Sequence, residues 1–318
     1  MSPPQFFFTT TAEEVANTFA NEIEGKNVLI TGTSLNGIGF EAARAIAKHA
    51  NLVVITGYNE ARLKLSEEAL TNEIHTVKIR RLVLDLSSLA AVRKAAAEVN
   101  TYPEPIHVLI HNAAATIGPF KLTVDGLESQ IATAHIGSTL PLHQANPPQA
   151  ARVHPATLRA SSSPLAKATA SAPAKPSKEA YETMDAYYQA KSAMVLMAIE
   201  LSKRSNGRIN GYSLEPGLIH TNMNQKAESV AGLQAIGVLD ANGNPSSDRF
   251  QWKTIPQGAA TIVAAAFDPS LNAIPGAYLA DSTAANDKIA AHSSDNANAK
   301  KLWDVTEEIV GEMFVFDE

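Results

Sequence analysis

The sequence predicts a doubly wound α/β fold, in which a parallel β-sheet is covered by helices on both faces. Three observations lead to this fold class. Short apolar stretches typical of strands alternate with longer stretches that have helical periodicity, which predicts right-handed βαβ units. The strand-like stretches are almost entirely apolar, as expected for strands that are buried on both sides. A glycine-rich segment, residues 31–39, separates the first strand from the first helix.

The alternation of strands and helices is clearest in the first half of the chain. Strands are predicted over residues 27–32, 52–56, 79–86 and 107–111, and helices over 37–49, 60–70 and 90–99, with a further helix beginning within 124–136. In the second half, helices are predicted over residues 179–203, 257–266 and 300–314, and strands over 208–214 and 276–280.

The region between these two halves has a different composition. Residues 137–177 hold ten Ala, seven Pro and six Ser, and no acidic residue lies between Glu128 and Glu179. The prolines argue against a long helix or a central strand in this stretch. A composition that buries so little apolar surface is typical of disorder.

Length and composition limit the functional classes. The chain has 318 residues, 45% of them hydrophobic, and a formal net charge of −6. These values predict one domain spanning residues 1–318 and argue against nucleic acid as a partner. The absence of cysteine excludes disulfides and thiolate metal sites, and we expect no metal. No apolar run is long enough for a membrane span, and the N-terminus lacks the basic region of a signal peptide, so we expect a cytoplasmic protein.

The glycine-rich segment 31–39 predicts a dinucleotide site. A strand, a glycine-rich turn and a helix form the arrangement that holds a pyrophosphate. Gly32, Gly37 and Gly39 let the backbone turn tightly and approach the ligand closely. The helix that follows offers unpaired N–H groups and the positive end of its dipole to the phosphates.

Tyr187 and Lys191 form a second candidate site within the predicted helix 179–203. Residues four apart share one helix face. A lysine ammonium beside a phenol favours the phenolate and lowers a pKa that is ordinarily about 10. We therefore expect Tyr187 to act as a general acid and base near neutral pH. Lys191 has a second predicted role as a hydrogen-bond donor to a ribose hydroxyl. Alone, the spacing also fits an exposed helix pair, but together with the glycine-rich segment it favours catalysis.

These motifs, together with Asn112-Ala113-Ala114 after the fourth strand, resemble the short-chain dehydrogenase/reductase family. The resemblance is greatest to the branch near retinol dehydrogenases and related carbonyl reductases, and it covers about residues 25–136 and 178–279. It implies a three-layer Rossmann fold and reversible hydride transfer between a nicotinamide cofactor and a carbonyl/alcohol pair. It also implies that Asp85 contacts adenine and that Pro216-Gly217 with Thr221 reaches the nicotinamide carboxamide.

The expected cofactor contacts are therefore numerous and spread over the chain. They are Gly32, Ser34, Asn36, Gly37, Ile38, Gly39, Tyr58, Asn59, Arg62, Asp85, Leu86, Asn112, Ala113, Ala114, Tyr187, Lys191, Pro216, Gly217 and Thr221. Some of these residues also have a purely structural interpretation. Asp85 is a candidate helix cap, Asn112 a candidate turn residue, and Pro216-Gly217 a candidate strand end.

The residues after the second strand bear on cofactor choice. An acidic residue there would hold a ribose 2′-hydroxyl, whereas an arginine would accept a 2′-phosphate. No acid directly follows this strand, and Tyr58 stands where related proteins often carry arginine. Asn59 and Arg62 are able to bind a phosphate, so NADP is preferred over NAD. Tyr58 has the alternative role of stacking on adenine.

The sequence departs from the family pattern near the catalytic residues. The family places a strand ending in Ser-Ser before the catalytic tyrosine, and here the only candidate cluster is Ser161-Ser162-Ser163, from which Ser162 is assigned to catalysis. The helix asparagine that supports proton transfer in the family aligns with Ala134.

These departures leave two hypotheses open. The first is an NADP(H)-dependent oxidoreductase that acts on a hydrophobic carbonyl or alcohol and assembles as a homodimer or homotetramer. The second is a catalytically impaired nucleotide-binding homologue, either a pseudoenzyme or the product of a faulty gene model in which residues 137–177 are read out of frame.

Overall fold

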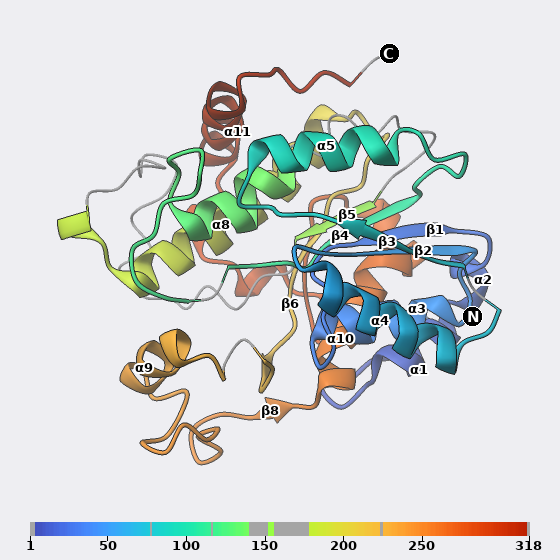
Figure 1. The fold of residues 1–318 in the computed structure, drawn as a ribbon, viewed down its shortest axis with the longest axis horizontal. Coiled ribbons are helices and arrows are strands. Elements are labelled where there is room, and N and C mark those ends of the chain that lie inside the picture. Colours follow the sequence, from blue (N-terminus) through green and yellow to red (C-terminus); the bar gives the residue numbers. More distant parts are fainter. Residues whose placement is uncertain are drawn as a thin grey trace.

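The computed structural model describes residues 4–76, 78–115, 117–139, 152–155, 178–222 and 225–316. Its centre is a five-stranded parallel sheet with the order β3-β2-β1-β4-β5 (Figure 1). The strands are β1 (Asn27–Ile30), β2 (Leu52–Gly57), β3 (Lys78–Val83), β4 (Val108–His111) and β5 (Arg152–Pro155). The chain reverses its direction of progress across the sheet between β1 and β4. Ligands of such sheets bind beyond the carboxyl ends of the strands at this point.

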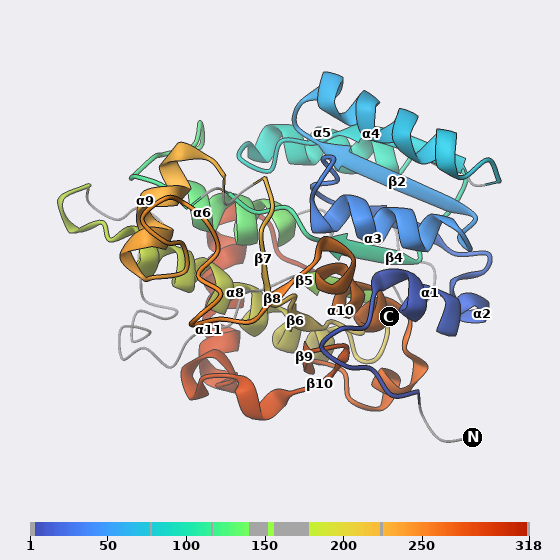
Figure 2. The same ribbon diagram turned by 90° about the horizontal axis from the view of Figure 1, so that it is seen from below.

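Helices cover both faces of the sheet, as predicted. Residues 28–30 of β1 pair in register with residues 108–110 of β4, and all residues of both strands are buried. One face packs against α1, α3, α4 and α10, and the other against α5, α8 and α11 (Figures 1 and 2). These helices are α1 (Ala12–Thr18), α3 (Ile38–Ala47), α4 (Glu60–Glu73), α5 (Leu89–Val99), α8 (Thr183–Arg204), α10 (Ile255–Phe267) and α11 (Asn296–Val310).

The N-terminal segment, residues 4–24, forms a short helix that the sequence analysis did not predict. Thr11 caps α1, and its side chain and that of Glu14 form a reciprocal capping box. The buried face of α1 packs against α3 and α10. Phe6 contacts Phe19 edge to face at 5.7 Å between ring centroids, whereas Phe7 is 63% exposed. The segment therefore belongs to the core of one sheet face.

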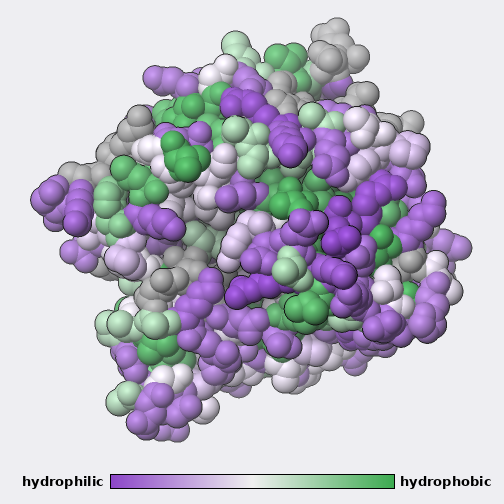
Figure 3. Space-filling view, in the orientation of Figure 1, coloured by the Kyte–Doolittle hydropathy of each residue, from purple (hydrophilic) through white to green (hydrophobic). Residues whose placement is uncertain are grey.

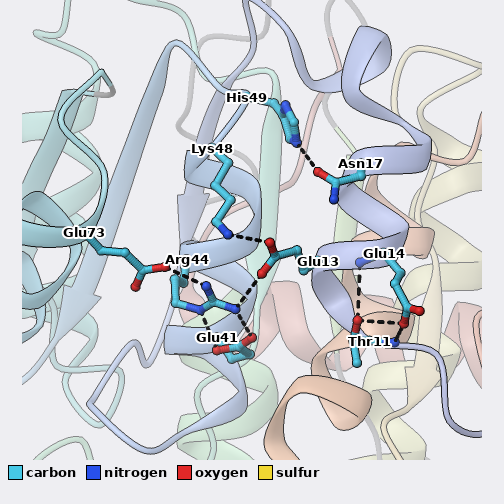
Figure 4. A network of polar contacts seen from close by, with 9 residues as sticks. All are labelled: Thr11, Glu13, Glu14, Asn17, Glu41, Arg44, Lys48, His49 and Glu73. Atoms are coloured by element: carbon cyan, nitrogen blue, oxygen red, sulfur yellow. Dashed lines mark hydrogen bonds and ion pairs between the residues drawn. The ribbon is translucent and has the colours of Figure 1, made fainter.

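Arg44 on α3 ties this segment to the rest of the fold (Figure 4). Its guanidinium contacts the carboxylates of Glu13 (3.2 Å), Glu41 (2.8 Å) and Glu73 (2.7 Å), which come from α1, α3 and α4. Lys48 adds an ion pair to Glu13 at 2.6 Å. The carboxylates around Arg44 raise the pKa of its guanidinium, so that the network stays charged.

Beyond the main sheet, several short strands extend the structure. β6 (Ser213–Glu215) pairs parallel with β9 (Tyr278–Ala280), which pairs antiparallel with β10 (Thr283–Ala284). β7 (Leu218–Ile219) pairs parallel with β8 (Trp252–Lys253). Between β7 and β8 the chain forms α9 (Ala227–Ala235), which lies beyond the carboxyl ends of the sheet strands (Figures 1 and 2). The sequence analysis predicted β6 and β9 but not β7, β8, β10 or α9.

Strand β5 corrects the expectation of disorder for one part of the proline-rich stretch. Residues 152–155 pair with residues 108–111 of β4, and the expectation that the prolines exclude a central strand is not contradicted, because β5 lies at the edge. Pro155 is the last residue of β5 and β5 is the outermost strand of its sheet, a position where the missing N–H of proline is tolerated. The expectation of disorder elsewhere in this stretch falls on residues 140–151 and 156–177, which lie outside the described residues.

The helix expected to begin within residues 124–136 begins at Ser129. It comprises α6 (Ser129–Ile131), which continues into a π-helical turn, η1 (Ala132–Ile136). The remaining elements are α2 (Ala20–Ile23) and the 3₁₀ turns η3 (Lys178–Ala180), η4 (Pro269–Ala273), η5 (Asn286–Lys288) and η6 (Ala291–Ser293). Among the described helices, none combines the length and the apolarity needed to cross a membrane. On the face seen in Figure 3, hydrophobic residues lie scattered among hydrophilic ones.

Candidate active site

The turn between β1 and α3 has the geometry of a ligand cradle. Gly32 has a φ of +72°, and a Cβ at this position would lie 2.8 Å from the Cα of Ala113. Asn36 is also left-handed, with a φ of +60°, and Ser34 and Asn36 are exposed. Gly37 begins α3, and no side chain caps this helix. The first N–H groups of α3 therefore remain available to an anion at the positive end of the helix dipole.

Among the described helices on the sheet, α3 shares its uncapped start with α8, whereas the others have a side-chain cap. Asn59, Ser88, Thr254 and Asp295 cap α4, α5, α10 and α11 with their side chains.

Asn112 joins the turn to the end of β4. Its Nδ2 donates hydrogen bonds to the carbonyl oxygens of Thr31 (2.9 Å) and Gly32 (2.8 Å). The Thr31 hydroxyl accepts in return from the backbone N–H groups of Asn112 and Ala113, both at 3.0 Å. A Cβ at Gly39 would clash with the Asn112 amide. The interpretation of Asn112 as a structural residue is thus supported. Its Oδ1, however, is buried without a partner and is left for a ligand or water.

Asp85 follows β3 and is exposed at the same edge of the sheet. Its Oδ1 accepts hydrogen bonds from the backbone N–H and the hydroxyl of Ser87, at 2.9 and 2.6 Å. The cap of α5 is Ser88, so the interpretation of Asp85 as the helix cap is wrong. Leu86 is buried in the core beneath it.

The three candidate residues after β2, Tyr58, Asn59 and Arg62, differ in their contacts. Tyr58 is 66% exposed, which leaves its ring open to a stacking partner. The Oδ1 of Asn59 accepts the N–H of Arg62 at 3.0 Å and caps α4. Asn59 therefore already has a structural role, and its Nδ2 is the group that remains to donate to a phosphate. The Arg62 side chain lies on the exposed side of α4.

Tyr187 and Lys191 lie together on α8, and both are buried. The Lys191 Nζ is 5.4 Å from the centroid of the Tyr187 ring. Among the residues that the structure describes, none is a hydrogen-bond partner of the Tyr187 hydroxyl. Burial, with a smaller contribution from Tyr188, raises the pKa of Tyr187 above its ordinary value. The predicted lowering of this pKa by Lys191 is therefore wrong, because desolvation by burial is the largest cause of the shift and acts in the opposite direction.

Burial also affects Lys191 itself, whose pKa is lowered to about 8. In both residues, burial disfavours the charged form. At neutral pH the pair therefore consists of a neutral phenol and a lysine that is still mostly protonated.

The position of the missing family asparagine is occupied by apolar packing. Ala134 lies in the π-helical turn and contacts Ala190 and Met194 of α8 in a small buried cluster. This cluster is next to the turn of α8 that carries Lys191. Ser162, the assigned catalytic serine, lies outside the described residues, as do Ser161 and Ser163.

The segment after β6, which holds the residues predicted for the nicotinamide end, reaches the glycine-rich turn. Gly217 has a φ of +86°, so the chain turns sharply after Pro216. Asn222, the neighbour of Thr221, donates from Nδ2 to the carbonyl oxygen of Leu35 at 2.6 Å. Residues 187 positions apart in the sequence therefore meet at one site. The sequence analysis did not identify Asn222, because an isolated asparagine in a loop carries no distinguishing pattern.

An apolar cluster adjoins Tyr187. Ile117, Leu233, Val238 and Leu239 are buried with it, and further side chains from α8, β7, α9 and β8 pack against them: Met184, Tyr188, Leu218, Val230, Phe250 and Trp252. We call this group the apolar cover. The sequence analysis found no diagnostic group in residues 223–250. A periodicity search misses such a cluster because it is assembled from five separate segments of the chain.

Ile38 and Ala114 complete the predicted set, and both are only partly exposed. Ile38 begins α3 and packs into the core near Gly258. Ala114 follows the Asn112 turn. Among the described side chains, no group of three or more His, Asp or Glu residues is arranged to hold a metal ion.

Comparison with known proteins agrees with this arrangement. The family model described as short chain dehydrogenase matches residues 26–140. The short-chain dehydrogenase TIC 32 A, chloroplastic, of Brassica napus is 30% identical over 317 residues, which cover 95% of this chain and 93% of that protein.

Two solved structures show the same fold. An uncharacterized protein from Mycobacterium paratuberculosis superposes with a TM-score of 0.69 at 23% identity, over 93% of this chain and 98% of that one. A blue fluorescent protein from a metagenomic library, in complex with NADPH, superposes with a TM-score of 0.59 at 22% identity, over 81% and 96% of the two chains. With the Brassica napus relative matching along nearly its whole length, the chain belongs to the short-chain dehydrogenase family.

Proposed function

We propose that this protein is an NADP(H)-dependent oxidoreductase that interconverts the carbonyl and alcohol forms of a hydrophobic small molecule. The observation that carries the proposal is the Tyr187 hydroxyl, which is buried beside the apolar cover without a hydrogen-bond partner. An unpartnered buried hydroxyl is costly, and a substrate oxygen would complete its hydrogen bond. Its neighbour Lys191 supplies a positive charge on the same helix.

The residues of the β1–α3 turn fit a dinucleotide. Gly32 and Gly39 bring the turn close to β4, and α3 begins without a side-chain cap. The unpartnered Oδ1 of Asn112 offers an acceptor at the same place. We assign the pyrophosphate to residues 32–39, Asp85 and Leu86 to adenine, and Asn112-Ala113-Ala114 to the floor of the site. We assign Pro216, Gly217 and Thr221 to the nicotinamide end.

A bound nicotinamide cofactor supplies or accepts the hydride, and the side chains handle the proton. In the reductive direction Tyr187 donates its phenolic proton to the carbonyl oxygen, and in the oxidative direction it takes the proton back from the alcohol. Lys191 stabilises the negative charge that forms on the phenol and holds the ribose. We assign Ser162 the role of hydrogen-bond donor to the carbonyl oxygen.

Burial raises the pKa of Tyr187, so its phenol is protonated at neutral pH, which is the form that the reductive direction requires. The apolar cover favours a hydrophobic substrate, since eleven hydrophobic side chains, Tyr187 included, pack together there. Asn59 and Arg62 favour NADP over NAD. We further propose one domain, a homodimer or homotetramer, and a cytoplasmic location, although the Brassica napus relative is named as chloroplastic.

The test is NADPH oxidation with a panel of hydrophobic aldehydes and ketones, followed by absorbance at 340 nm, with NADH in parallel. We expect turnover with NADPH that exceeds turnover with NADH. NADPH binding without turnover of any substrate would instead identify a catalytically impaired homologue. A protease-sensitive product that binds no nucleotide would point to a faulty gene model.

A further inference from the structure

We propose that Lys253 is a positioning residue that fixes the loop after β6 at the nicotinamide end of the site. The inference rests on the proposed function, which assigns Pro216, Gly217 and Thr221 to that end. The Lys253 side chain is only 2% exposed, and its Nζ pairs with Asp281 Oδ1 at 2.6 Å. Lysine is seldom buried so completely unless it is paired, so the burial of Lys253 needs a structural or functional reason.

The aliphatic stem of Lys253 lies directly against Gly217. A Cβ at Gly217 would lie 3.0 Å from the lysine Cδ and 3.3 Å from Cε, closer than ordinary van der Waals contact. Gly217 is also left-handed, a conformation that glycine adopts without strain. The bend after Pro216 therefore rests on the lysine stem, and only glycine leaves room for it.

The backbone of Lys253 holds the same loop from a second direction. β7 and β8 pair in parallel, with Ile219 opposite Lys253. Lys253 thus restrains this loop in two ways. Its side chain restrains the bend at Gly217, and its backbone pairing with Ile219 restrains β7. The next residues, Thr221 and Asn222, run on to the glycine-rich turn, where Asn222 binds the Leu35 carbonyl.

The ammonium of Lys253 joins two further segments to this loop. The Phe8 ring of the N-terminal segment lies 4.8 Å from Nζ, which places a π-face beside the charge. Asp281 stands between β9 and β10, and both Asp281 and Ser282 have positive φ values of 49° and 64°. Lys288 lies at 3.9 Å from the other oxygen of Asp281. Three segments therefore meet at the buried ammonium of Lys253. They are the strained turn at Asp281 and Ser282, the N-terminal segment and the loop after β6.

A buried ion pair is weak evidence for stability, because desolvation offsets much of the attraction between the charges. The ion pair does, however, fix the position of the Lys253 side chain. Its Nζ contacts the Asp281 carboxylate while its aliphatic stem lies against Gly217. A role in positioning thus accounts for the burial better than a gain in stability does. Lys253 touches neither reacting atoms nor catalytic side chains, so it acts through the loop.

The test compares the wild type with Lys253→Met, which keeps most of the stem but removes the charge. Hydrogen exchange is measured in the protein without cofactor, for the amides of residues 217–222. Dissociation constants are measured for NADPH and for 2′,5′-ADP, which lacks the nicotinamide half. We expect exchange in residues 217–222 to accelerate about tenfold or more, and NADPH to bind about tenfold more weakly, with 2′,5′-ADP changed less than about twofold.

Two further variants keep the test decisive. Asp281→Asn removes the partner charge at a partly exposed position and should reproduce the effects of Lys253→Met even where that variant folds poorly. Arg44→Met is the matched control, since it removes a cation from another ion-pair network that also anchors the N-terminal segment. It should lower stability without accelerating exchange in residues 217–222.

Unchanged exchange and unchanged NADPH affinity in both Lys253→Met and Asp281→Asn would overturn the positioning role. An equal loss of NADPH and 2′,5′-ADP binding would also overturn it, because the effect would then be global. A wild-type protein that binds neither ligand would refute the proposed function instead. The exchange measurement in the cofactor-free protein would still decide whether Lys253 fixes the loop.

Discussion

At the level of single residues, the proposed chemistry depends on the hydroxyl of Tyr187. It is buried and unpartnered, and its pKa is raised by burial. Tyr187→Phe removes the acid while keeping the ring and its packing. We expect the rate of NADPH-dependent reduction to fall by about 10² to 10⁴. The free energy of unfolding should change little, because no intramolecular hydrogen bond is lost.

The matched control is Tyr188→Phe, since Tyr188 is the neighbouring ring on the same helix, 5.8 Å away between centroids. This variant should retain activity. Steady-state kinetics and urea denaturation of both variants test the assignment. Equal activity losses in the two variants would remove Tyr187 from the catalytic role.

Gly39 is a second residue whose size matters. A Cβ at this position would clash with the Asn112 amide and lie 2.6 Å from the Gly32 carbonyl oxygen. The Gly32 carbonyl belongs to the backbone, and the Asn112 amide is hydrogen-bonded to the backbone. Moving either group therefore costs free energy. Gly39→Ala should therefore lower the free energy of unfolding by about 1–3 kcal/mol and weaken NADPH binding.

Gly232→Ala in α9 provides the comparison, because there a Cβ meets only the Ile117 side chain at an ordinary 3.6 Å. Alanine favours a helix more than glycine does, so this variant should be neutral or slightly stabilising. Chemical denaturation and nucleotide titration of the two variants check both expectations. A Gly39→Ala variant as stable as Gly232→Ala would contradict the close approach.

At the level of the elements, α1 shows what the sequence contained but the prediction missed. Thr11 and Glu14 form a capping box, a signal that is visible in the sequence as Thr-Ala-Glu-Glu. The helix is only seven residues long, too short to stand out by periodicity. Its stability comes instead from packing on α3 and α10 and from the contacts of Arg44.

The contacts of Arg44 give a prediction for this segment. Arg44→Met removes a cation that binds three carboxylates, and Glu41, the most buried of them, loses this partner. We expect a loss of about 1–2 kcal/mol in unfolding free energy, since partial exposure limits the value of each pair. Limited proteolysis should also begin earlier in residues 4–24. A loss that does not shrink at high salt would show that packing, rather than charge, holds the segment.

The elements also show where sequence-based prediction succeeds and fails. The strands and helices between residues 27 and 111 were predicted correctly in type and order, because buried parallel strands and glycine-rich turns leave strong local patterns. β5 was not predicted, because Pro155 and its polar neighbours carry no strand pattern and only pairing with β4 supports it. β7 and β8 have two residues each, which is too short for any periodicity.

For the candidate site, the residues could be recognised in the sequence, but the effect of burial on their pKa values could not. The motif containing Tyr187 and Lys191 was recognisable from spacing, and the structure places both residues on one buried turn of α8. The direction of the Tyr187 pKa shift was wrong, because burial depends on tertiary packing that local spacing does not encode. The apolar cover and Lys253 were missed for the same reason, since each is defined by contacts between distant segments.

At the level of the whole molecule, two buried histidines link stability to pH. Burial lowers the pKa of His111 to about 3 and that of His135 to about 4. In the unfolded chain both side chains titrate near 6.5. The unfolded state therefore binds more protons as the pH falls below about 6.5, and stability falls with it, by up to about 1.4 kcal/mol per pH unit for each histidine.

Urea denaturation at pH 7.5, 6.0 and 5.0 measures this slope, in a range where most carboxylates remain ionised. His111→Asn should flatten the pH dependence, whereas His75→Gln, at an exposed position, should leave it unchanged. A wild-type stability that is constant from pH 7.5 to 5.0 would show that neither histidine is buried in its neutral form.

The packing of α1 against α10 has a consequence for synthesis on the ribosome. α1 is translated within the first 18 residues, but its apolar face is covered by a helix that begins at Ile255. At about 5–20 residues per second, roughly 12–50 s pass before that helix exists. During this interval Val15 and Ala16 lack the partner that buries them. The nascent chain is then a substrate for chaperones that bind apolar segments, and the N-terminal segment is among the last parts of the protein to fold.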